Sequence, residues 1–508
     1  MNRNHDPLLG ALWKLAGNAR WFSGRSRGGV PSQVELTDWF RPPGEASPGL
    51  RSALLEMAYP TGETERYHVP LAFHAAGECP TEPLARIELE GTGFDVAEVA
   101  DEPAAMTALL DCLSSGAPGF VATREVPSGL PGRRYRGEQS NTSIFFGDLI
   151  VGKIFRRIEN GPNVDVEMHR ALSGSGAVAE LFGWWEWHGA HLGIFLEALP
   201  DPRDGFAEAC SAAGTGTSFT AQAEELGHQL CRVHRLLASR FPTSRLPGRE
   251  LAAQSRSRLE AAILEVPLLG QFREMARRTY ATIEDLELPT QRIHGDCHLG
   301  QALLTPAGWR YVDFEGEPIK SLPERRRPDS PLRDVAGMLR SFDYAAATGH
   351  APAGWREEAR SAFLHGYGSL SADAVTLLLA YELDKADSLL LPDARLPLLL
   401  PLNPGSAHAP PGPGPPGAGV PDDSADETGG ADAAVGLGAD AADGGVDRLA
   451  HVVVLGRGAA PGAAASAARI TCSAPAPDSQ TRDAQAPDAH PTQARTSGTA
   501  QAPDVHPA

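Results

Sequence analysis

The chain has 508 residues, of which 42% are hydrophobic, and its formal net charge is −19 at pH 7. This length predicts two to four domains, and an acidic surface repels phosphate backbones and anionic lipids, which argues against nucleic-acid or membrane-surface binding. The N-terminal residues contain no apolar signal segment. We therefore expect a soluble, cytoplasmic protein.

The first 95 residues predict a small α+β subdomain. A helix is expected near Leu8–Leu15, and the strand-like runs Leu54–Tyr59 and Arg66–Leu71 are separated by turn residues typical of a hairpin. The Gly- and Arg-rich loop at 23–29 is interpreted as a solvated loop rather than a phosphate site.

Residues 96–200 predict a compact sheet with one helix packed on it. The expected elements are, in order, a helix at Glu102–Leu113, strands at Thr142–Phe146 and Leu149–Phe155, a helix at Val164–Leu172, and strands near Glu186–His188 and Leu192–Leu196. The first strand pair is joined tightly, as in a hairpin.

From residue 216 the pattern becomes helical. Leu226, Leu230, Val233 and Leu237 recur at i, i+4, i+7 and i+11, which predicts one buried stripe along a helix. Further helices are expected at 250–264, 268–286, 333–347, 355–367 and 371–386, with a hairpin of Gln301–Leu304 and Trp309–Asp313 between them.

Residues 401–508 contain no Phe, Trp, Tyr or Lys and are dominated by Ala, Pro, Gly and Asp. Such a segment cannot bury enough apolar surface to offset the loss of conformational entropy on folding. We expect a disordered, low-complexity tail.

The segment most informative about chemistry is His294-Gly295-Asp296, followed by Gln301 and, after the expected hairpin, by Asp313-Phe314-Glu315. Phosphoryl transfer to a hydroxyl requires one carboxylate that orients the hydroxyl and accepts its proton. It also requires oxygen ligands that hold Mg²⁺ against the phosphates of ATP. Each motif alone is common by chance or as a turn, but the hairpin would return Asp313 beside Gln301. In this order, the motifs predict a kinase site.

This order resembles that of the aminoglycoside- and choline-kinase-like phosphotransferases, which are relatives of protein kinases. More narrowly, the chain is similar to bacterial maltokinases over roughly residues 8–386. The segments that carry the narrower resemblance are His294–Gln301, Asp313–Pro318, Pro323–Asp334 and Arg340–Tyr344, with weaker support from Ala19–Gly24 and Glu138–Ser143.

The resemblance implies an α+β, bilobal protein-kinase-like fold. Its parts would be an N-terminal cap subdomain (1–95), a nucleotide-binding N-lobe (96–200), a mainly helical catalytic C-lobe (201–400) and the disordered C-terminal tail (401–508). The implied activity is the phosphorylation of maltose to maltose 1-phosphate by ATP with Mg²⁺. The product would feed α-glucan and glycogen synthesis, and the protein would associate with other α-glucan enzymes.

By motif, Asp296 would be the catalytic base. Gln301 and Asp313 would be metal ligands, with Glu315 as a second carboxylate. Asp334, early in an expected helix, is interpreted as a structural aspartate that caps or anchors a loop.

No G-x-G-x-x-G precedes the hairpin at 142–155, but Ser140, Asn141 and Thr142 could cover the phosphates of ATP with their backbone N–H groups. Adenine is placed, by the resemblance alone, against the backbone near Glu197 and Ala198.

Lys153, on the second strand of that hairpin, is the candidate for pairing with the α- and β-phosphates. Glu167, on the following helix, would hold this lysine. Asp165 is the competing partner, and the sequence does not choose between them.

A disaccharide needs polar partners for its hydroxyls and aromatic faces for its rings. The acceptor candidates near the catalytic loop are His298, Glu317, Arg325, Asp329, Arg333 and Tyr344. A solvated basic loop is an equal alternative for Arg325–Arg327.

Two other functions stay open. One is a kinase for another small alcohol, such as an aminoglycoside or a different sugar. The other is a non-catalytic kinase-like binding module, against which the intact Asp296, Gln301 and Asp313 argue. The resemblance stops after Ala386, so the tail is either a frameshift product or a lineage-specific extension.

Overall fold

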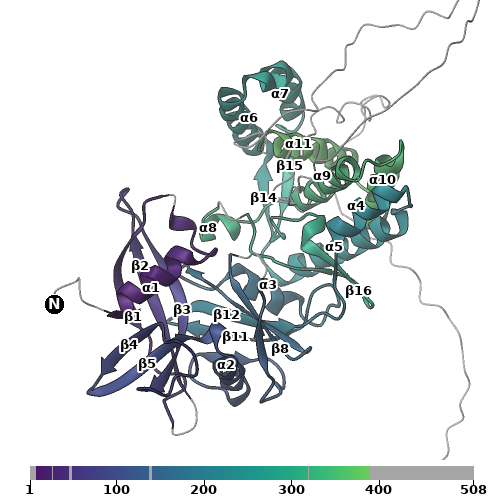
Figure 1. Cartoon of the computed structure of the whole chain (residues 1–508). Helices are drawn as coiled ribbons and strands as arrows, with labels where there is room; N and C mark the ends of the chain where they lie inside the picture. Colours follow the sequence, from purple (N-terminus) through teal and green to yellow (C-terminus); the bar gives the residue numbers. More distant parts are fainter. Residues whose placement is uncertain (1–6, 26, 45–47, 137–139, 318–319, 389–508) are drawn as a thin grey trace, which may run out of the picture. The chain divides into compact units, whose positions relative to one another are not determined.

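The computed structural model describes residues 7–388 except 26, 45–47, 137–139 and 318–319. The architecture is α+β, as the sequence predicts (Figure 1). The expected tail at 401–508 lies outside the described residues. The domain boundaries near 95, 200 and 400 stay a proposal, and the first sheet continues past residue 95.

The N-terminal sheet has the strand order β1-β2-β3-β5-β4, and β10 also pairs with β3. Helix α1 (Pro7–Asn18) packs on this sheet through Leu8, Leu12 and Ala16, which are buried at helical spacing. The predicted hairpin is β2 with β3. The strands are β1 (Val30–Leu36), β2 (Gly49–Ala58), β3 (Thr64–Ala75), β4 (Ala85–Leu89), β5 (Thr92–Glu98) and β10 (Arg157–Ile158).

The second sheet has the order β6-β11-β12-β9-β8-β7. Helix α2 (Pro103–Ser115) shares a core with Ile144, Phe146, Ile150 and Ile154, so it covers one face of this sheet. The strands are β6 (Phe120–Ala122), β7 (Gly132–Arg134), β8 (Thr142–Phe146), β9 (Ile150–Ile154), β11 (Leu181–Trp187) and β12 (Ala190–Glu197).

Helix α3 (Val164–Leu172) has the bounds that the sequence predicts. Its Val166 packs with Phe155 and Ile194 in a separate small core beside the sheet. Because side chains alternate between the two faces of a strand, Lys153 points away from its neighbours Ile154 and Gly152, which lie on the α2 side.

The remaining part is mainly helical and shares one large core. The predicted stripe of Leu226, Leu230, Val233 and Leu237 is fully buried in α5. Two small sheets, β13-β16-β17 and β14-β15, lie among the helices. The elements are α4 (Gly205–Thr215), α5 (Thr220–Arg240), α6 (Gly248–Glu265), α7 (Arg273–Ala281), α8 (Leu322–Arg325), α9 (Leu332–Thr348), α10 (Trp355–Tyr367), α11 (Ala372–Ser388), β13 (Arg203–Asp204), β14 (Ser244–Pro247), β15 (Glu287–Thr290), β16 (Ala302–Thr305) and β17 (Gly308–Tyr311).

The prediction of one helix over 268–286 is wrong. This stretch contains a 3-10 helix, Pro267–Phe272, and then the shorter α7, before the chain enters β15. Pro267 at the first turn and Gly270 in its middle favour the tighter, shorter helix over a long α-helix. The sequence also missed the short or half-exposed strands β1, β6 and β7, whose apolar alternation is weak.

Across the described part of the chain, no helix combines the length and the apolar character needed to cross a membrane.

Candidate active site

The loop that carries His294-Gly295-Asp296 is held by Asp334 at the start of α9. The backbone N–H groups of His294 and Gly295 donate to the two carboxylate oxygens of Asp334, at 2.7 and 2.9 Å. His234 Nε2 donates to the same carboxylate at 2.9 Å. Burial alone would raise the pKa of Asp334, but these donors outweigh it and the pKa is lowered. The prediction that Asp334 is structural is confirmed.

Gly295 has a φ of 87°, and a Cβ added there would meet the Cα of Gly316 at 3.4 Å. Glycine suits this position because other residues are strained at positive φ. The two motifs that the sequence singles out, at 294–296 and 313–315, therefore lie against each other in the structure.

Asp296 is half-buried at the tip of this loop. Among the residues that the structure describes, none donates a hydrogen bond to its carboxylate. Its oxygens are thus free to accept a hydrogen bond from a substrate hydroxyl, which is the geometry that a general base needs.

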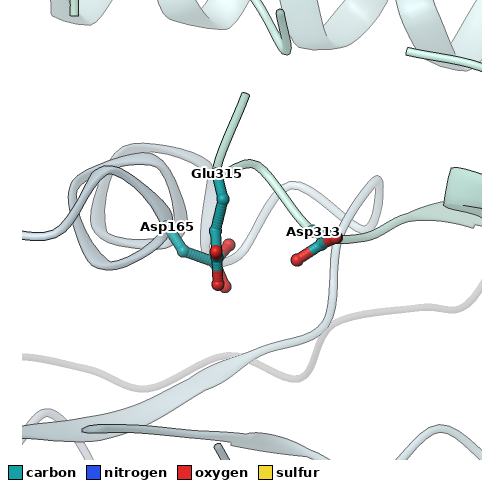
Figure 2. A group of neighbouring side chains, drawn as sticks. All are labelled: Asp165, Asp313 and Glu315. Atoms are coloured by element: carbon teal, nitrogen blue, oxygen red, sulfur yellow. The ribbon is translucent and has the colours of Figure 1, made fainter. Parts of the chain in front are cut away.

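Three carboxylates form the candidate metal centre. One oxygen each of Asp165, Asp313 and Glu315 lie within 4.8 Å of one another. Figure 2 shows Asp165 and Glu315 side by side, with the carboxylate of Asp313 facing them. Such hard oxygen donors are the ligands that Mg²⁺ prefers, so the residues fit the ion that the sequence predicts.

Lys153 lies among these carboxylates. Its Nζ is 2.6 Å from Asp313 Oδ1, 2.6 Å from Glu315 Oε1 and 3.3 Å from Asp165 Oδ2. Burial alone would lower the pKa of Lys153, but the three carboxylates outweigh it and raise the pKa well above the usual value. Three carboxylates against one ammonium leave a negative site that suits a divalent cation.

The predicted hairpin places Asp313 beside Gln301. The N–H of Val312 donates to the carbonyl of Gln301 at 3.0 Å, and Gln301 Nε2 donates to Asp313 Oδ2 at 3.3 Å. Asp313 has a φ of 62°, a left-handed conformation that costs of order 1 kcal/mol or more for a residue with a side chain. This turn aims the carboxylate back toward Lys153.

Glu167 does not hold Lys153, which corrects the first choice of partner. Asp165 contacts the lysine and also accepts a hydrogen bond from the N–H of Phe314 at 3.1 Å. Glu167 instead pairs with Arg292 at 3.3 Å and Arg326 at 3.1 Å. Two residues apart on a helix, Asp165 and Glu167 point in nearly opposite directions, so only one can face the strand that carries Lys153.

Of the residues expected to form the nucleotide loop, Asn141 contacts this site. Asn141 Nδ2 donates to Glu315 Oε1 at 2.9 Å, and Thr142 Oγ1 accepts a hydrogen bond from Arg156 Nε at 2.8 Å. Ser140 is exposed. The loop residues just before Ser140, at 137–139, lie outside the described residues.

Two donors expected to contact adenine are already engaged. The N–H of Glu197 donates to the carbonyl of Glu180 at 2.8 Å, and the N–H of Ala198 donates to the carbonyl of Leu149 at 2.9 Å. These two N–H groups are therefore not free for adenine, because they extend the pairing of the sheet. A nucleotide contact at these residues would have to use their carbonyl groups.

The structure brings together three of the predicted acceptor residues. Arg333 pairs with Glu317 at 2.6 Å and with Asp329 at 3.2 Å. Helix α11 adds two residues that the sequence analysis did not assign to the site. Tyr381 donates to Asp329 at 2.8 Å, and Lys385 Nζ lies 3.7 Å from Glu317. Their spacing of four residues, on one face of a helix, was the signal available in the sequence.

The other three acceptor candidates have different surroundings. His298 Nδ1 accepts a hydrogen bond from the N–H of Gly300 at 3.1 Å, so this ring shapes the loop. Arg325 donates to the carbonyl of Glu315 at 3.1 Å and pairs with Glu159. Tyr344 accepts a hydrogen bond from Arg340 at 2.8 Å. Because it lies ten residues after Asp334 on α9, it is about 15 Å further along the helix.

The alternative of a solvated basic loop does not hold for Arg325. Its side chain is 10% exposed and bridges the turn after Asp313 to Glu159. An arginine with these buried contacts is fixed by the protein, so it is not a solvated loop residue.

The surroundings of Glu317 predict how the stability of the protein depends on pH. Burial alone would raise the pKa of this residue, but Arg333, Lys385 and Lys320 outweigh it and lower the pKa to about 2, from a usual 4.5. A carboxyl whose pKa is depressed by folding stabilises the protein above its unfolded pKa, and this contribution is lost as the pH falls through the folded value. We expect Glu317 to contribute about 3 kcal/mol to the free energy of unfolding at neutral pH, lost between about pH 4.5 and pH 2.

Urea unfolding of the wild type and of Glu317→Gln at several pH values in this range checks the prediction. The stability difference between the two proteins should shrink as the pH falls. A difference that stays constant from pH 7 to pH 2 would contradict the ion-pair cluster around Glu317.

Comparisons with known proteins show that part of this chain is similar to phosphotransferases. The sequence model of the phosphotransferase enzyme family, APH, matches residues 216–377, which include the loop of Asp296 and the hairpin that ends at Asp313.

Two curated relatives are similar over part of the chain. A glucosamine kinase of Mycolicibacterium smegmatis is 32% identical over 235 residues, which is 41% of this chain and 58% of the relative. A glucosamine kinase of Streptacidiphilus jiangxiensis is 27% identical over 231 residues, which is 41% of this chain and 53% of the relative. The matched region thus spans just over half the length of these curated relatives.

Solved structures extend the likeness to most of the fold. A glucosamine kinase in complex with glucosamine, ADP and inorganic phosphate superposes with a TM-score of 0.53 at 20% identity, covering 75% of this chain and 94% of that one. A glucosamine kinase in crystal form B superposes with a TM-score of 0.56 at 19% identity, covering 77% of this chain and 93% of that one. The chain therefore has the α+β, kinase-like fold that the sequence predicts.

Proposed function

We propose that this protein transfers the γ-phosphoryl group of ATP to a hydroxyl of a small sugar. The observation that carries the proposal is the meeting of three groups from distant parts of the chain. Lys153 lies among Asp165, Asp313 and Glu315, and the loop of Asp296 lies against the turn that follows Asp313. A base, a cation-binding carboxylate cluster and a phosphate-binding lysine are what phosphoryl transfer requires.

In this mechanism, Asp296 orients the acceptor hydroxyl and accepts its proton. Asp313, Glu315 and Gln301 would hold Mg²⁺, which neutralises phosphate charge when it is bound, and Asp165 would join them or hold Lys153. Lys153 would bind the α- and β-phosphates. Asn141, which already donates to Glu315, would position the loop over the phosphates.

The acceptor that we propose first is glucosamine. It differs from maltose, the sugar that the resemblance of the motifs implies. Support comes from the two curated relatives and the two superposed solved structures, which are glucosamine kinases. The second candidate is maltose, which the motifs at 294–301 and 313–318 favour through their resemblance to maltokinases. Its product would be maltose 1-phosphate.

A panel of acceptors tests the proposal. The purified protein is incubated with MgATP and, separately, with glucosamine, maltose, glucose, an aminoglycoside and choline, and phosphorylated product is measured by mass spectrometry. We expect kcat/KM for glucosamine to exceed that for maltose at least about tenfold, because polar groups that bind an amino sugar are left unpaired when its amino group is absent.

Each outcome of the panel has one meaning. Faster phosphorylation of maltose would replace glucosamine by the second candidate, and faster phosphorylation of the aminoglycoside or choline would overturn the sugar proposal. If no acceptor is phosphorylated while MgATP still binds, the non-catalytic alternative stands. Asp296→Asn, purified in parallel, controls for a contaminating kinase.

A further inference from the structure

A cavity of about 570 Å³ lies where the end of α1, the start of α2 and strands β7 and β8 meet. Among the described residues, its charged lining consists of Arg20, Arg133, Arg134 and Arg136 together with one acidic residue, Asp101. This concentration of arginine is unusual in a chain whose net charge is −19. A volume of this size suits a small metabolite.

Most of the cavity lies on the face of the sheet opposite to the nucleotide site, and Asn141, which donates to Glu315, lies at its border with that site. Ser143 pairs with Lys153 in the register of β8 and β9, so these two side chains share one face. Arg134 pairs with Ile144, which packs in the core with α2, so Arg134 lies on the other face. Thr142, two residues before Ile144, lies on that face as well and lines the cavity.

The pairing of β7 with β8 also shows which arginines lie on which face of the sheet. Tyr135 continues the pairing of β7 and β8, because its N–H donates to the carbonyl of Ser143 at 2.9 Å. Arg136 therefore lies opposite Thr142, on the cavity face. The guanidinium of Arg133 lies 5.3 Å from the centre of the Phe145 ring, on the other face. Of the three arginines at 133–136, Arg134 and Arg136 thus direct their cationic groups to the cavity.

One of these two arginines has no acidic partner among the described residues. Arg134 pairs with Asp101, but Arg136 is exposed and has no described acidic partner. The start of α2 adds to the positive potential, since Pro103 occupies the first turn of a helix of 13 residues and lines the cavity. Guanidinium groups bind phosphate oxygens in bidentate fashion, which makes a phosphate the ligand group of best fit.

We propose that this cavity is a second ligand site, which binds a small organic phosphate monoester and is separate from the nucleotide site. The phosphate lies between Arg134 and Arg136. The organic part lies toward Trp21 and Met106, which form the apolar side of the lining.

The test is a binding titration by calorimetry on the full chain. Glucose 6-phosphate and AMP are the two probes, which separate a sugar phosphate from a nucleoside monophosphate, and glucose is the uncharged control. Each titration is made with and without saturating AMP-PNP and Mg²⁺. We expect at least one probe to bind in both conditions and glucose not to bind.

The double variant Arg134→Ala/Arg136→Ala should weaken probe binding at least about tenfold, because two charged hydrogen-bonding groups are lost. The matched control is Arg277→Ala/Arg278→Ala, which removes the same charge from two exposed arginines of α7 and should bind as the wild type does. Arg136→Ala alone serves if the double variant does not fold.

Three results would overturn this site: neither probe binds at millimolar concentration, AMP-PNP displaces the probe, or the cavity variants bind as the control does. Probe binding requires no catalysis and no bound nucleotide. A protein that binds glucose 6-phosphate but phosphorylates no sugar would refute the proposed function and leave the second site standing.

Discussion

Asp296→Asn is expected to lower kcat by about 10²- to 10⁴-fold, the usual contribution of a general base. The side chain keeps its size, and no described residue hydrogen-bonds to it, so the fold loses no contact. The loop itself stays anchored, because its backbone N–H groups bind Asp334 rather than Asp296. MgATP affinity should therefore remain close to that of the wild type.

The measurement is steady-state kinetics with the best acceptor of the panel, together with the melting temperature and the affinity for MgATP. Asp148→Asn is the matched control, because Asp148 is exposed in the turn between β8 and β9 and should leave kcat unchanged. A folded Asp296→Asn protein that keeps more than about a tenth of the wild-type kcat would remove Asp296 from the role of base.

Asp313→Ala should weaken Mg²⁺-dependent nucleotide binding by at least about 100-fold, because the cluster loses its most accessible carboxylate and Gln301 loses its partner. The side chain of Asp313 is 43% exposed, whereas that of Glu315 is 23% exposed. Burial raises the pKa of Glu315, which disfavours the charged form that binds metal. Glu315→Ala should therefore have the smaller effect.

Calorimetric titration with AMP-PNP, with and without Mg²⁺, separates the two variants. Asp313→Asn is a useful third arm, since it keeps one oxygen ligand and removes only the charge. Equal effects of Asp313→Ala and Glu315→Ala would contradict the ranking, and a larger effect of Glu315→Ala would make Glu315 the principal metal carboxylate. Binding that is the same with and without Mg²⁺ in the wild type would dismiss the metal centre itself.

Local elements were predictable from the sequence because short-range contacts define them. The turn between β8 and β9 and the bounds of α3 follow from apolar alternation and from turn residues, and both occur as expected. The hairpin of β16 and β17 brings Asp313 to Gln301 by its own backbone pairing, independently of the rest of the fold. The proximity of those two residues therefore follows from the local sequence of the hairpin.

Only the tertiary structure decided which charges meet across elements. Asp165 rather than Glu167 contacts Lys153, because this depends on how α3 is rotated about its axis when its apolar side packs on Phe155 and Ile194. Helix α11 delivers Lys385 to Glu317, which lies far away in the sequence. Local hydrogen bonds and hydrophobic periodicity determine the elements of this protein, whereas side-chain packing between elements determines the partner of each charge in its site.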